Sequence, residues 1–428
     1  MQYFTFLGLG SKNLEDGTTR YDKLDTTFKD DETFLCNTPF IQEAVWKKYK
    51  DDINTVSVFV TSEAKRKTLP ELQKTCPDIP MECIDISDFY TFEEFIPLLI
   101  EHIKDEKIII DVTHCFRSVP LRMVLAFNYI DQMKDVEIEH VFYGQKKENI
   151  VTIEDLQKDY EMQKISLYLN EFNDTLTIAT DKWPSVLADD RRLTRFMKAI
   201  RQFNEMLELS AFDKAVISVE RIIKEARTLE AQPDEYRLLI PLLSKLIEKL
   251  QKCTEGTPKK RKSALIQLLI EHKRYQLAAT FIDQFFREEL IRDLLYPENL
   301  TQTPQQFAED HPELINRWTA PNFPYQFSQY LKVYALRLDG NTKSAPNKKM
   351  DQLYDALWDK KMINEKNFNA IDKLFDNHRN YNLQKDFYQK IRNNMNHGHS
   401  IQLSASPKEN NRQMVQLLQD MLNLIEKI

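Results

Sequence analysis

Short apolar runs alternate with helical patterns along the first third of the chain. The runs are rich in Val, Ile and Phe and predict β-strands, and the segments between them carry apolar residues at helical spacing. The predicted strands are 2–10, 54–62, 81–87, 107–114 and 136–145, and the predicted helices are 39–51, 92–105 and 121–134. Such alternation predicts right-handed βαβ units in a mostly parallel, doubly wound α/β sheet. The polar, turn-rich segment 11–35 interrupts it and predicts a small hairpin or flap at the sheet edge.

The strand pattern ends near residue 155, and long helical patterns replace it. We therefore predict two domains, an α/β domain over 1–158 and an all-α region over 159–428. The polar stretches 253–263 and 339–349 predict surface loops between helices. The helical patterns cover 195–209, 214–230, 238–252, 263–295 and 412–428.

Composition narrows the class of protein. The chain has 428 residues, is 42% hydrophobic and 29% charged, and carries a formal net charge of −7, which is typical of a globular protein and excludes diffuse binding of nucleic acid by overall positive charge. No apolar stretch approaches the roughly 20 residues that span a bilayer, and the N-terminus does not resemble a signal peptide. We expect a cytoplasmic protein without membrane contact. The five cysteines are scattered and predict neither disulfides nor a metal site.

Polar residues follow the predicted strand 107–114 in the stretch DVTHCFRSVP. Thr113 and His114 would lie at the carboxyl edge of the sheet, where α/β folds bind ligands. Ser118 could cap the next helix, whose free N–H groups would bind an anion together with Arg117. GLGSK, residues 8–12, occupies the same position after the first strand, but it is not a complete dinucleotide-binding motif. The alternative is that these residues only cap a strand and a helix.

DVTHCFRSVP resembles the DxTHG motif of CRISPR-associated proteins with a CARF domain. FTFLGLGSK and VFYGQ are similar to the first and fifth strands of that family. The resemblance implies a Rossmann-like sensor that binds cyclic oligoadenylate across the two-fold axis of a homodimer. Cys115 stands where the motif has Gly, which implies a different loop there. The ligand contacts implied by the resemblance are Gly8, Gly10, Ser11, Lys12, Thr113, His114 and Arg117.

A second group of polar residues, RNNMNHGHS, ends an amphipathic helical pattern at 392–400. Arg392 and His397 are five positions apart, which separates them by roughly 140° on one helix. Two such helices meeting at a two-fold axis could bring both pairs into one cleft. His can transfer protons near neutral pH, and Arg can bind phosphate oxygens, so this cleft could cleave RNA without a metal. The alternative is a polar helix end.

This segment resembles the R-x4-H motif of HEPN ribonucleases, including the polar Asn393 after the Arg. The resemblance implies Arg392, His397 and Asn393 as catalytic residues of a metal-independent endoribonuclease that leaves a 2′,3′-cyclic phosphate. We expect His399 and the basic stretch 259–262 to be solvated loop residues. The aromatic residues of QLAATFIDQFF, 276–286, are expected to belong to the core.

Together the two motifs resemble the CARF-HEPN class of type III CRISPR auxiliary effectors. The implied protein is a homodimeric endoribonuclease that cleaves single-stranded RNA in antiviral defence. It needs no cofactor and is allosterically activated by cyclic oligoadenylate, with the tetra-adenylate favoured over the hexa-adenylate. Two alternatives stay open: a non-catalytic nucleotide-sensing regulator that binds DNA or a protein partner, and an enzyme whose sensor domain degrades its own activator.

Overall fold

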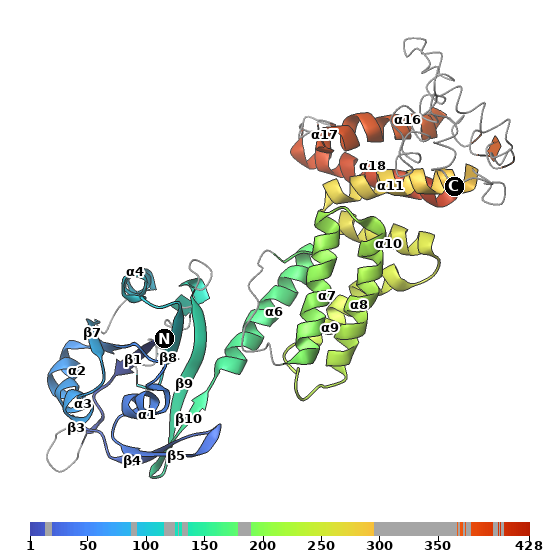
Figure 1. Ribbon diagram of the computed structural model, residues 1–428. Coiled ribbons are helices and arrows are strands. Elements are labelled where there is room, and N and C mark those ends of the chain that lie inside the picture. The colour runs from blue at the N-terminus through green and yellow to red at the C-terminus, as the bar shows by residue number, and fades with distance from the viewer. Residues whose placement is uncertain are drawn as a thin grey trace, which may run out of the picture. The chain divides into compact units, whose positions relative to one another are not determined.

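The computed structural model of the chain divides into two compact units (Figure 1). The division falls between Ile165 and Ser166, inside helix α6 (Gln157–Thr175). The predicted domain boundary at 158 lies near the start of the same helix. The structure describes residues 1–12, 19–86, 92–114, 125–126, 128–130, 136–178, 190–294, 366, 369–370, 373, 378–396, 401, 403 and 406–428.

Five adjacent parallel strands, in the order β7-β6-β1-β8-β9, form the sheet of the first unit from one edge inwards. Each overlaps one of the five predicted strands, so the Rossmann-like core of the α/β prediction is confirmed. The chain starts at β1 and adds strands first on one side and then on the other, which creates a switch point between β1 and β8. The strands are β1 (Gln2–Leu7), β6 (Thr55–Val60), β7 (Met81–Asp85), β8 (Lys107–Asp111) and β9 (Glu137–Lys147).

Three strands that the sequence pattern did not predict extend this sheet to eight and make it mixed. β10 (Ile150–Asp155) returns antiparallel to β9 after a turn at Glu148, whose φ is 55°. β4 (Leu24–Phe28) and β5 (Asp31–Thr38) form the far edge. β4 and β5 are antiparallel, so they form a hairpin at this edge, and the prediction of a small hairpin at the sheet edge over 11–35 is confirmed, although β5 continues to Thr38. Within the same range, β2 (Ser11–Lys12) and β3 (Thr19–Arg20) form a separate two-stranded sheet.

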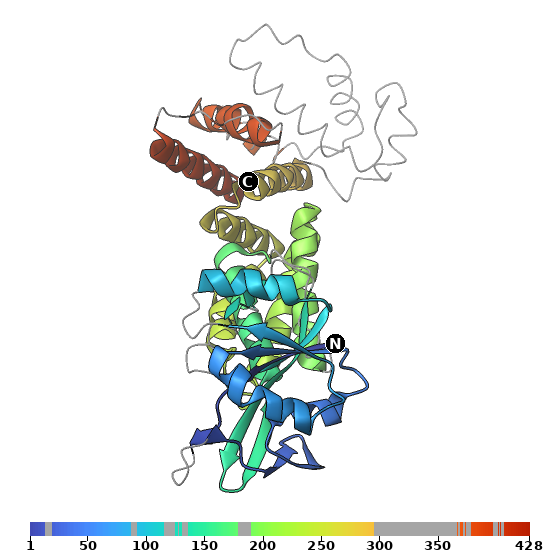
Figure 2. The ribbon, with the colours of Figure 1, turned by 90° about the vertical axis from the view of Figure 1, so that its left-hand side faces the viewer.

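Helices cover both faces of the sheet (Figure 2). Side chains alternate between the faces along each strand, so Tyr3 and Leu7 of β1 belong to one hydrophobic core, while Phe4 and Phe6 belong to the other. The first core lies under α1 (Ile41–Tyr49) and α3 (Leu69–Thr75), which follows α2 (Ser62–Lys67). The second lies under α4 (Phe92–His102) and the helical residues 125, 126 and 128–130.

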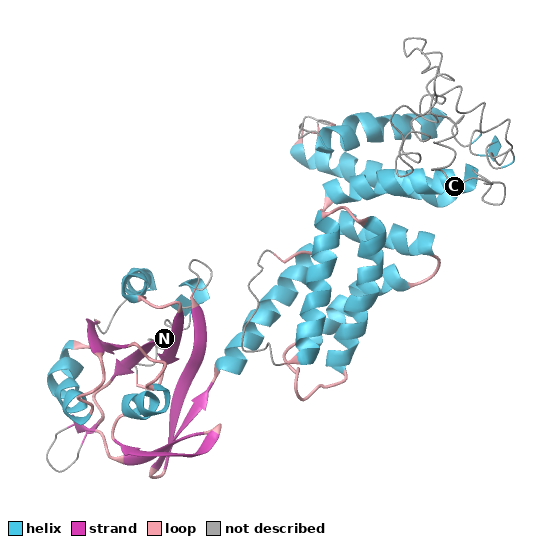
Figure 3. Ribbon diagram, in the orientation of Figure 1, coloured by secondary structure: helices cyan, strands magenta, loops and turns pink. Residues whose placement is uncertain are grey.

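The described part of the second unit is helical (Figure 3), as the periodic patterns predicted. Aromatic pairs join its helices: Phe172 packs on Phe203, and Phe212 stacks on Phe281 with ring centroids 4.5 Å apart. Within the described residues, no helix is long and apolar enough to cross a membrane. After α6 the elements are α7 (Arg191–Glu208), α8 (Phe212–Glu230), α9 (Ile240–Gln251), η2 (Lys252–Thr254), α10 (Pro258–Glu271), α11 (Tyr275–Leu294), α16 (His378–Asp386), the π-helical η5 (Phe387–Arg392), α17 (Asn393–Asn396) and α18 (Pro407–Lys427).

Two local predictions need correction. The pattern 263–295 is not one helix, because the chain turns at Lys273, whose φ is 61°, between α10 and α11. The basic stretch 259–262 lies in the first turn of α10 and not in a solvated loop, because Thr257 caps that helix and Pro258 starts it. Its Lys262 pairs with Asp213 at 2.6 Å. The core prediction for 276–286 is confirmed for its three Phe residues, which are at most 1% exposed.

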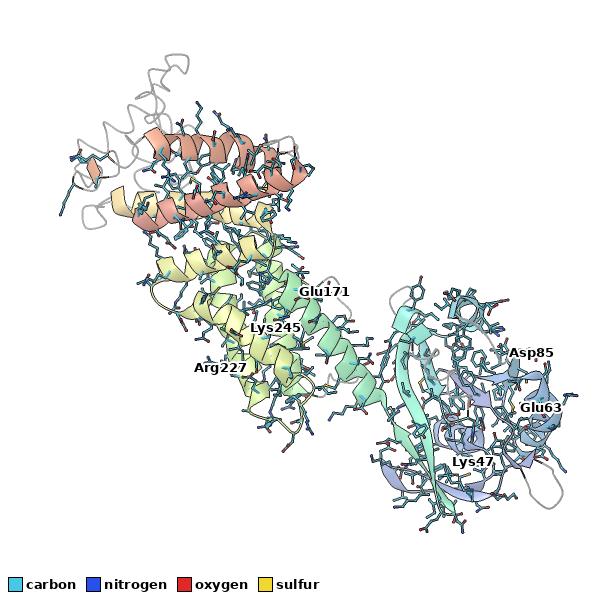
Figure 4. All side chains as sticks on the ribbon, turned by 180° about the vertical axis from the view of Figure 1, so that it is seen from behind. Lys47, Glu63, Asp85, Glu171, Arg227 and Lys245 are labelled. Carbon is cyan, nitrogen blue, oxygen red and sulfur yellow. The ribbon has the colours of Figure 1, made fainter. Side chains whose placement is uncertain are left out.

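Ion pairs occur on the surfaces of both units. Lys47 pairs with Glu43 along α1, and Lys245 of α9 pairs with Asp174 of α6 at 3.3 Å (Figure 4). Pairs as exposed as these contribute between zero and about 1 kcal/mol each. Packing of the cores, not surface charge, therefore accounts for most of the stability of each unit.

Candidate functional site

A cavity of about 430 Å³ opens beside the switch point of the sheet. It lies where β1, β6 and β8 end, which is the usual ligand position in an open α/β sheet. Its size is within the range of small-molecule sites. Four of the seven predicted ligand contacts line it, namely Gly8, Gly10, Thr113 and His114.

The structure does not describe the side chains of the other three predicted contacts. Ser11 and Lys12 form β2, so their backbone directly follows the cavity-lining Gly10. Arg117 lies outside the described residues, as do Cys115 and Ser118. The described lining of the cavity therefore includes part of each predicted segment, namely 8–10 and 113–114.

A buried carboxylate holds the loop that carries Thr113 and His114. Asp111, the last residue of β8, is fully buried. It accepts hydrogen bonds from the Thr5 hydroxyl at 2.6 Å, the Tyr3 hydroxyl at 3.2 Å and the Thr113 N–H at 2.9 Å. A buried charge is costly without such donors, and here they come from β1 and from the loop itself. Asp111 thus fixes the chain where it leaves the sheet.

Gln42 of α1 extends this buried network. Its amide donates to the Thr5 hydroxyl at 3.0 Å and to the Phe6 carbonyl at 2.9 Å. Burial raises the pKa of Tyr3 well above its usual value, and the nearby Asp111 charge acts in the same direction. Tyr3 therefore remains a neutral donor to Asp111. The wall of the cavity beside β1 is rigidly hydrogen-bonded before any ligand binds.

Two glycines leave room for the cavity. Gly144 of β9 donates its N–H to the Thr113 hydroxyl at 2.8 Å, and a Cβ at Gly144 would lie 2.6 Å from Ile41 Cδ1. A Cβ at Gly8 would lie 3.1 Å from the Tyr21 hydroxyl. Neighbouring side chains approach position 144 more closely than position 8, so a larger residue at 144 would displace the side chains of Ile41 and Thr113.

His114 lies beside an aromatic ring at the cavity. Its imidazole is 5.0 Å from the Tyr21 ring between centroids. Burial lowers the pKa of His114, and the Asp111 charge partly opposes this effect. A neutral imidazole offers one donor and one acceptor. Lys146 also lines the cavity and pairs with Asp22 at 3.5 Å, so the site combines apolar walls with a few polar groups and a cation.

The second candidate site centres on Arg392. Its Nε donates to Asp283 Oδ2 at 3.2 Å, and the Tyr388 hydroxyl donates to Asp283 Oδ1 at 2.7 Å. Asp283 lies on α11 and its side chain is 7% exposed, whereas the Arg392 side chain is 22% exposed. One buried carboxylate therefore orients two side chains of η5, and part of the guanidinium still reaches solvent.

The segment that carries Tyr388 and Arg392, η5, is π-helical. π-helical turns inside α-helices are often found at functional sites. Phe387 and Ile391 are fully buried and fix η5 within a core that includes α11 and α18. The predicted apolar stripe through 387 and 391 is thus confirmed, with Arg392 at its border. Asn393 begins α17 and is described by its backbone alone, and His397 and His399 lie outside the described residues.

Sequence reasoning missed three residues of these sites: Asp111, Tyr21 and Asp283. Asp111 had a visible signal, because a charged residue ending the apolar run KIIID must find donors. Tyr21 and Asp283 are distant in sequence from the groups that they contact, so no local pattern marks them. The part of the chain that the structure describes contains no group of three or more His, Cys, Asp or Glu side chains able to hold a metal ion.

The chain has a distant sequence similarity to a known protein. No protein-family model matches the chain. The chain is similar to a CRISPR-associated protein of Methanocaldococcus jannaschii, with 24% identity over 169 residues. The matched region is 37% of this chain and 25% of the relative, so the chain spans about a quarter of that protein's length.

Proposed function

We propose that this chain is a CRISPR-associated ribonuclease, activated when a cyclic oligoadenylate binds the first unit. The observation that carries the proposal is the cavity at the β1/β8 switch point, lined by Gly8, Gly10, Thr113 and His114. The similarity to a CRISPR-associated protein supports the biological setting. The resemblance of 392–397 to the R-x4-H motif supports the reaction.

The cavity suits part of a nucleotide ligand. Its polar groups include uncharged donors and acceptors that can bind base and ribose, and Lys146 can approach a phosphate. Tyr21 and His114 offer aromatic surface. A ring of several nucleotides exceeds one such cavity, so we propose that two copies of the chain share it across a two-fold axis.

The second unit would supply the reaction. Arg392, oriented by Asp283, would bind a phosphate oxygen and stabilise the charge that develops as the 2′-hydroxyl attacks. His397 would transfer a proton to or from the reacting oxygens, and Asn393 would assist in positioning the phosphate. The products would be a 2′,3′-cyclic phosphate and a 5′-hydroxyl. Ligand binding would shift a dimer equilibrium toward the geometry in which this site is complete.

The test is cleavage of a fluorescent single-stranded RNA in EDTA, with cyclic tetra-adenylate, cyclic hexa-adenylate or no activator. We expect cleavage with only one of the two cyclic oligoadenylates, the tetra-adenylate. His397→Ala should lower the rate by about 10²–10⁴-fold. His399→Ala is the matched control, since it removes a neighbouring imidazole and should retain activity.

Each alternative has its own outcome. Binding of the ring without RNA cleavage would favour the non-catalytic regulator. Loss of the ring during incubation, detected by chromatography, would favour a sensor that degrades its activator. Equal loss of activity in both histidine variants would contradict the assignment of His397.

A further inference from the structure

The helical unit carries a basic surface that the motifs do not include. Exposed basic side chains recur along α7 and α8 at steps of three, four or seven residues, which places them on one side of each helix. This surface is positively charged, whereas the formal net charge of the chain is −7. We call this surface the α7–α8 basic face, and it consists of Arg191, Arg195, Lys198, Lys214, Arg221 and Lys224.

Contacts between the two helices show that the two rows form one face. The Arg221 guanidinium donates to the Gln202 side chain at 2.7 Å, and Arg195 lies 4.0 Å from Glu225. Gln202 is seven residues beyond Arg195 on α7, so both contacts lie on the same side of that helix. The basic rows are therefore adjacent where α7 packs against α8.

Acidic residues of α8 point elsewhere. Asp213 pairs with Lys262, and Glu220 pairs with Arg261, both on α10. Two acidic residues lie on the side of the face: Glu225, which approaches Arg195 and is only 12% exposed, and Glu205 of α7, seven positions beyond Lys198, which pairs with Arg201. The positive charges of the face are thus incompletely balanced by its own helices, which favours a polyanionic partner.

We propose that the α7–α8 basic face binds the phosphate backbone of single-stranded RNA. The proposal deepens the proposed function, because it names where substrate is held outside the reacting site in the same unit as Arg392. The row from Arg191 to Lys198 is about 10 Å long, since a helix rises 1.5 Å per residue, and it can contact successive phosphates.

The chemistry of the face also predicts its selectivity. Its six defining residues are all Lys or Arg and none is aromatic. Phosphate contacts give affinity without base readout, whereas base preference in single strands comes mainly from stacking and contacts to base edges. The face should therefore bind RNA of any sequence with strong dependence on salt.

The test compares two double variants in the full-length His397→Ala protein, so that the RNA stays intact. Lys198→Gln with Lys224→Gln removes two charges from the face. Lys252→Gln with Lys260→Gln removes two charges from other exposed positions of the same unit. The measurement is fluorescence anisotropy of a labelled 20-nucleotide RNA of mixed sequence, titrated at several KCl concentrations.

We expect the face variant to raise the Kd about tenfold near 0.1 M salt, and to reduce the slope of log K against log salt by about 1.4, or 0.7 per phosphate contact. The control should change the Kd less than twofold. Equal effects of both variants, no effect of the face variant, or preferred binding of duplex DNA would overturn the proposal. Circular dichroism would verify that both variants remain helical.

The same two double variants, made without His397→Ala, test this proposal separately from the ribonuclease proposal. For activated cleavage, the face variant should raise KM and leave kcat unchanged, because it removes binding outside the reacting site. If the RNA binds the face but is never cleaved, the ribonuclease proposal fails and this one stands. If the RNA is cleaved with an unchanged KM, the face proposal fails alone.

Discussion

Each unit contains one buried aspartate that organises its candidate site, and the two are satisfied in different ways. Asp111 receives three hydrogen bonds from two neutral hydroxyls and a backbone N–H. Asp283 receives one from the Arg392 guanidinium and one from the Tyr388 hydroxyl. The first carboxylate thus fixes backbone, and the second fixes a charged side chain.

Because of this difference, loss of Asp111 should mainly affect the fold, and loss of Asp283 should mainly affect the candidate reaction. Loss of Asp111 leaves several buried donors without an acceptor, so the sheet edge itself should suffer. Loss of Asp283 removes the acceptor of one buried donor described above, the Tyr388 hydroxyl, while the Arg392 side chain still reaches solvent, so the change should affect the orientation of Arg392 more than the fold. The predictions below test this contrast, beginning with the largest expected effect.

Asp111→Ala should lower the free energy of opening of β1 and β8 by about 3 kcal/mol, because each buried donor without a partner costs roughly 1–3 kcal/mol. The measurement is hydrogen exchange with mass spectrometry on peptides from these strands. Asp22→Ala is the control, since the Asp22 side chain is 66% exposed and its loss should change stability by at most about 0.5 kcal/mol. A change below about 1 kcal/mol for Asp111→Ala would mean that water replaces the carboxylate.

Asp283→Ala should reduce activated RNA cleavage about 30-fold, which corresponds to about 2 kcal/mol, because Arg392 loses the group that orients it. Tyr388→Phe keeps the aromatic ring and the Asp283 carboxylate and removes one hydrogen bond. It should therefore raise the activation free energy of cleavage by about 1 kcal/mol, the net value of that bond. Rates are measured at saturating activator. If Asp283→Ala unfolds the helical unit instead, the contrast between the two aspartates is wrong.

Gly144→Ala should weaken binding of the activator about tenfold. Its Cβ would lie 2.6 Å from Ile41 Cδ1 and 3.0 Å from Thr113 Cγ2, so the side chains of Ile41 and the cavity-lining Thr113 must shift. Gly8→Ala is the matched comparison, because its nearest neighbour, the Tyr21 hydroxyl, is farther away at 3.1 Å. Calorimetry with the same ring should rank the two variants in this order, and the reverse order would place the ligand against Gly8.

The sequence predicted the elements whose pattern is local. Apolar runs such as KIIID identified β8, and helical spacing identified α7 and α8. The strand β10 was missed, and β4 and β5 were predicted only as an edge hairpin; all three are less continuously apolar, and they form because neighbouring strands bury Phe28, Cys36 and Ile153. Their presence depends on tertiary packing that a local pattern does not contain.

The same limit applies to the sites. Gly8, Gly10, Thr113 and His114 could be predicted to lie together because parallel strands end at one edge. The contacts of Asp111 with Tyr3 and of Asp283 with Arg392 join residues 108 and 109 positions apart. Such pairs require the fold, and so does the π-helical turn that places Tyr388 and Arg392 against one carboxylate.

The smallest predicted effect concerns His114 and pH. Burial lowers its pKa in the folded state, so the unfolded chain binds the proton more readily. The contribution of His114 to stability is therefore fully present above the unfolded pKa of about 6.5 and decreases as the pH falls through it, by at most about 1.4 kcal/mol per pH unit. His114→Gln should remove this part of the loss between pH 7.5 and 5.5, as measured by hydrogen exchange in β8. Equal losses of stability in the wild-type and His114→Gln proteins would contradict the prediction.

Asp111→Asn sharpens the test, because removing the carboxylate charge that opposes burial should lower the pKa of His114 further and extend the loss of stability to more acidic pH.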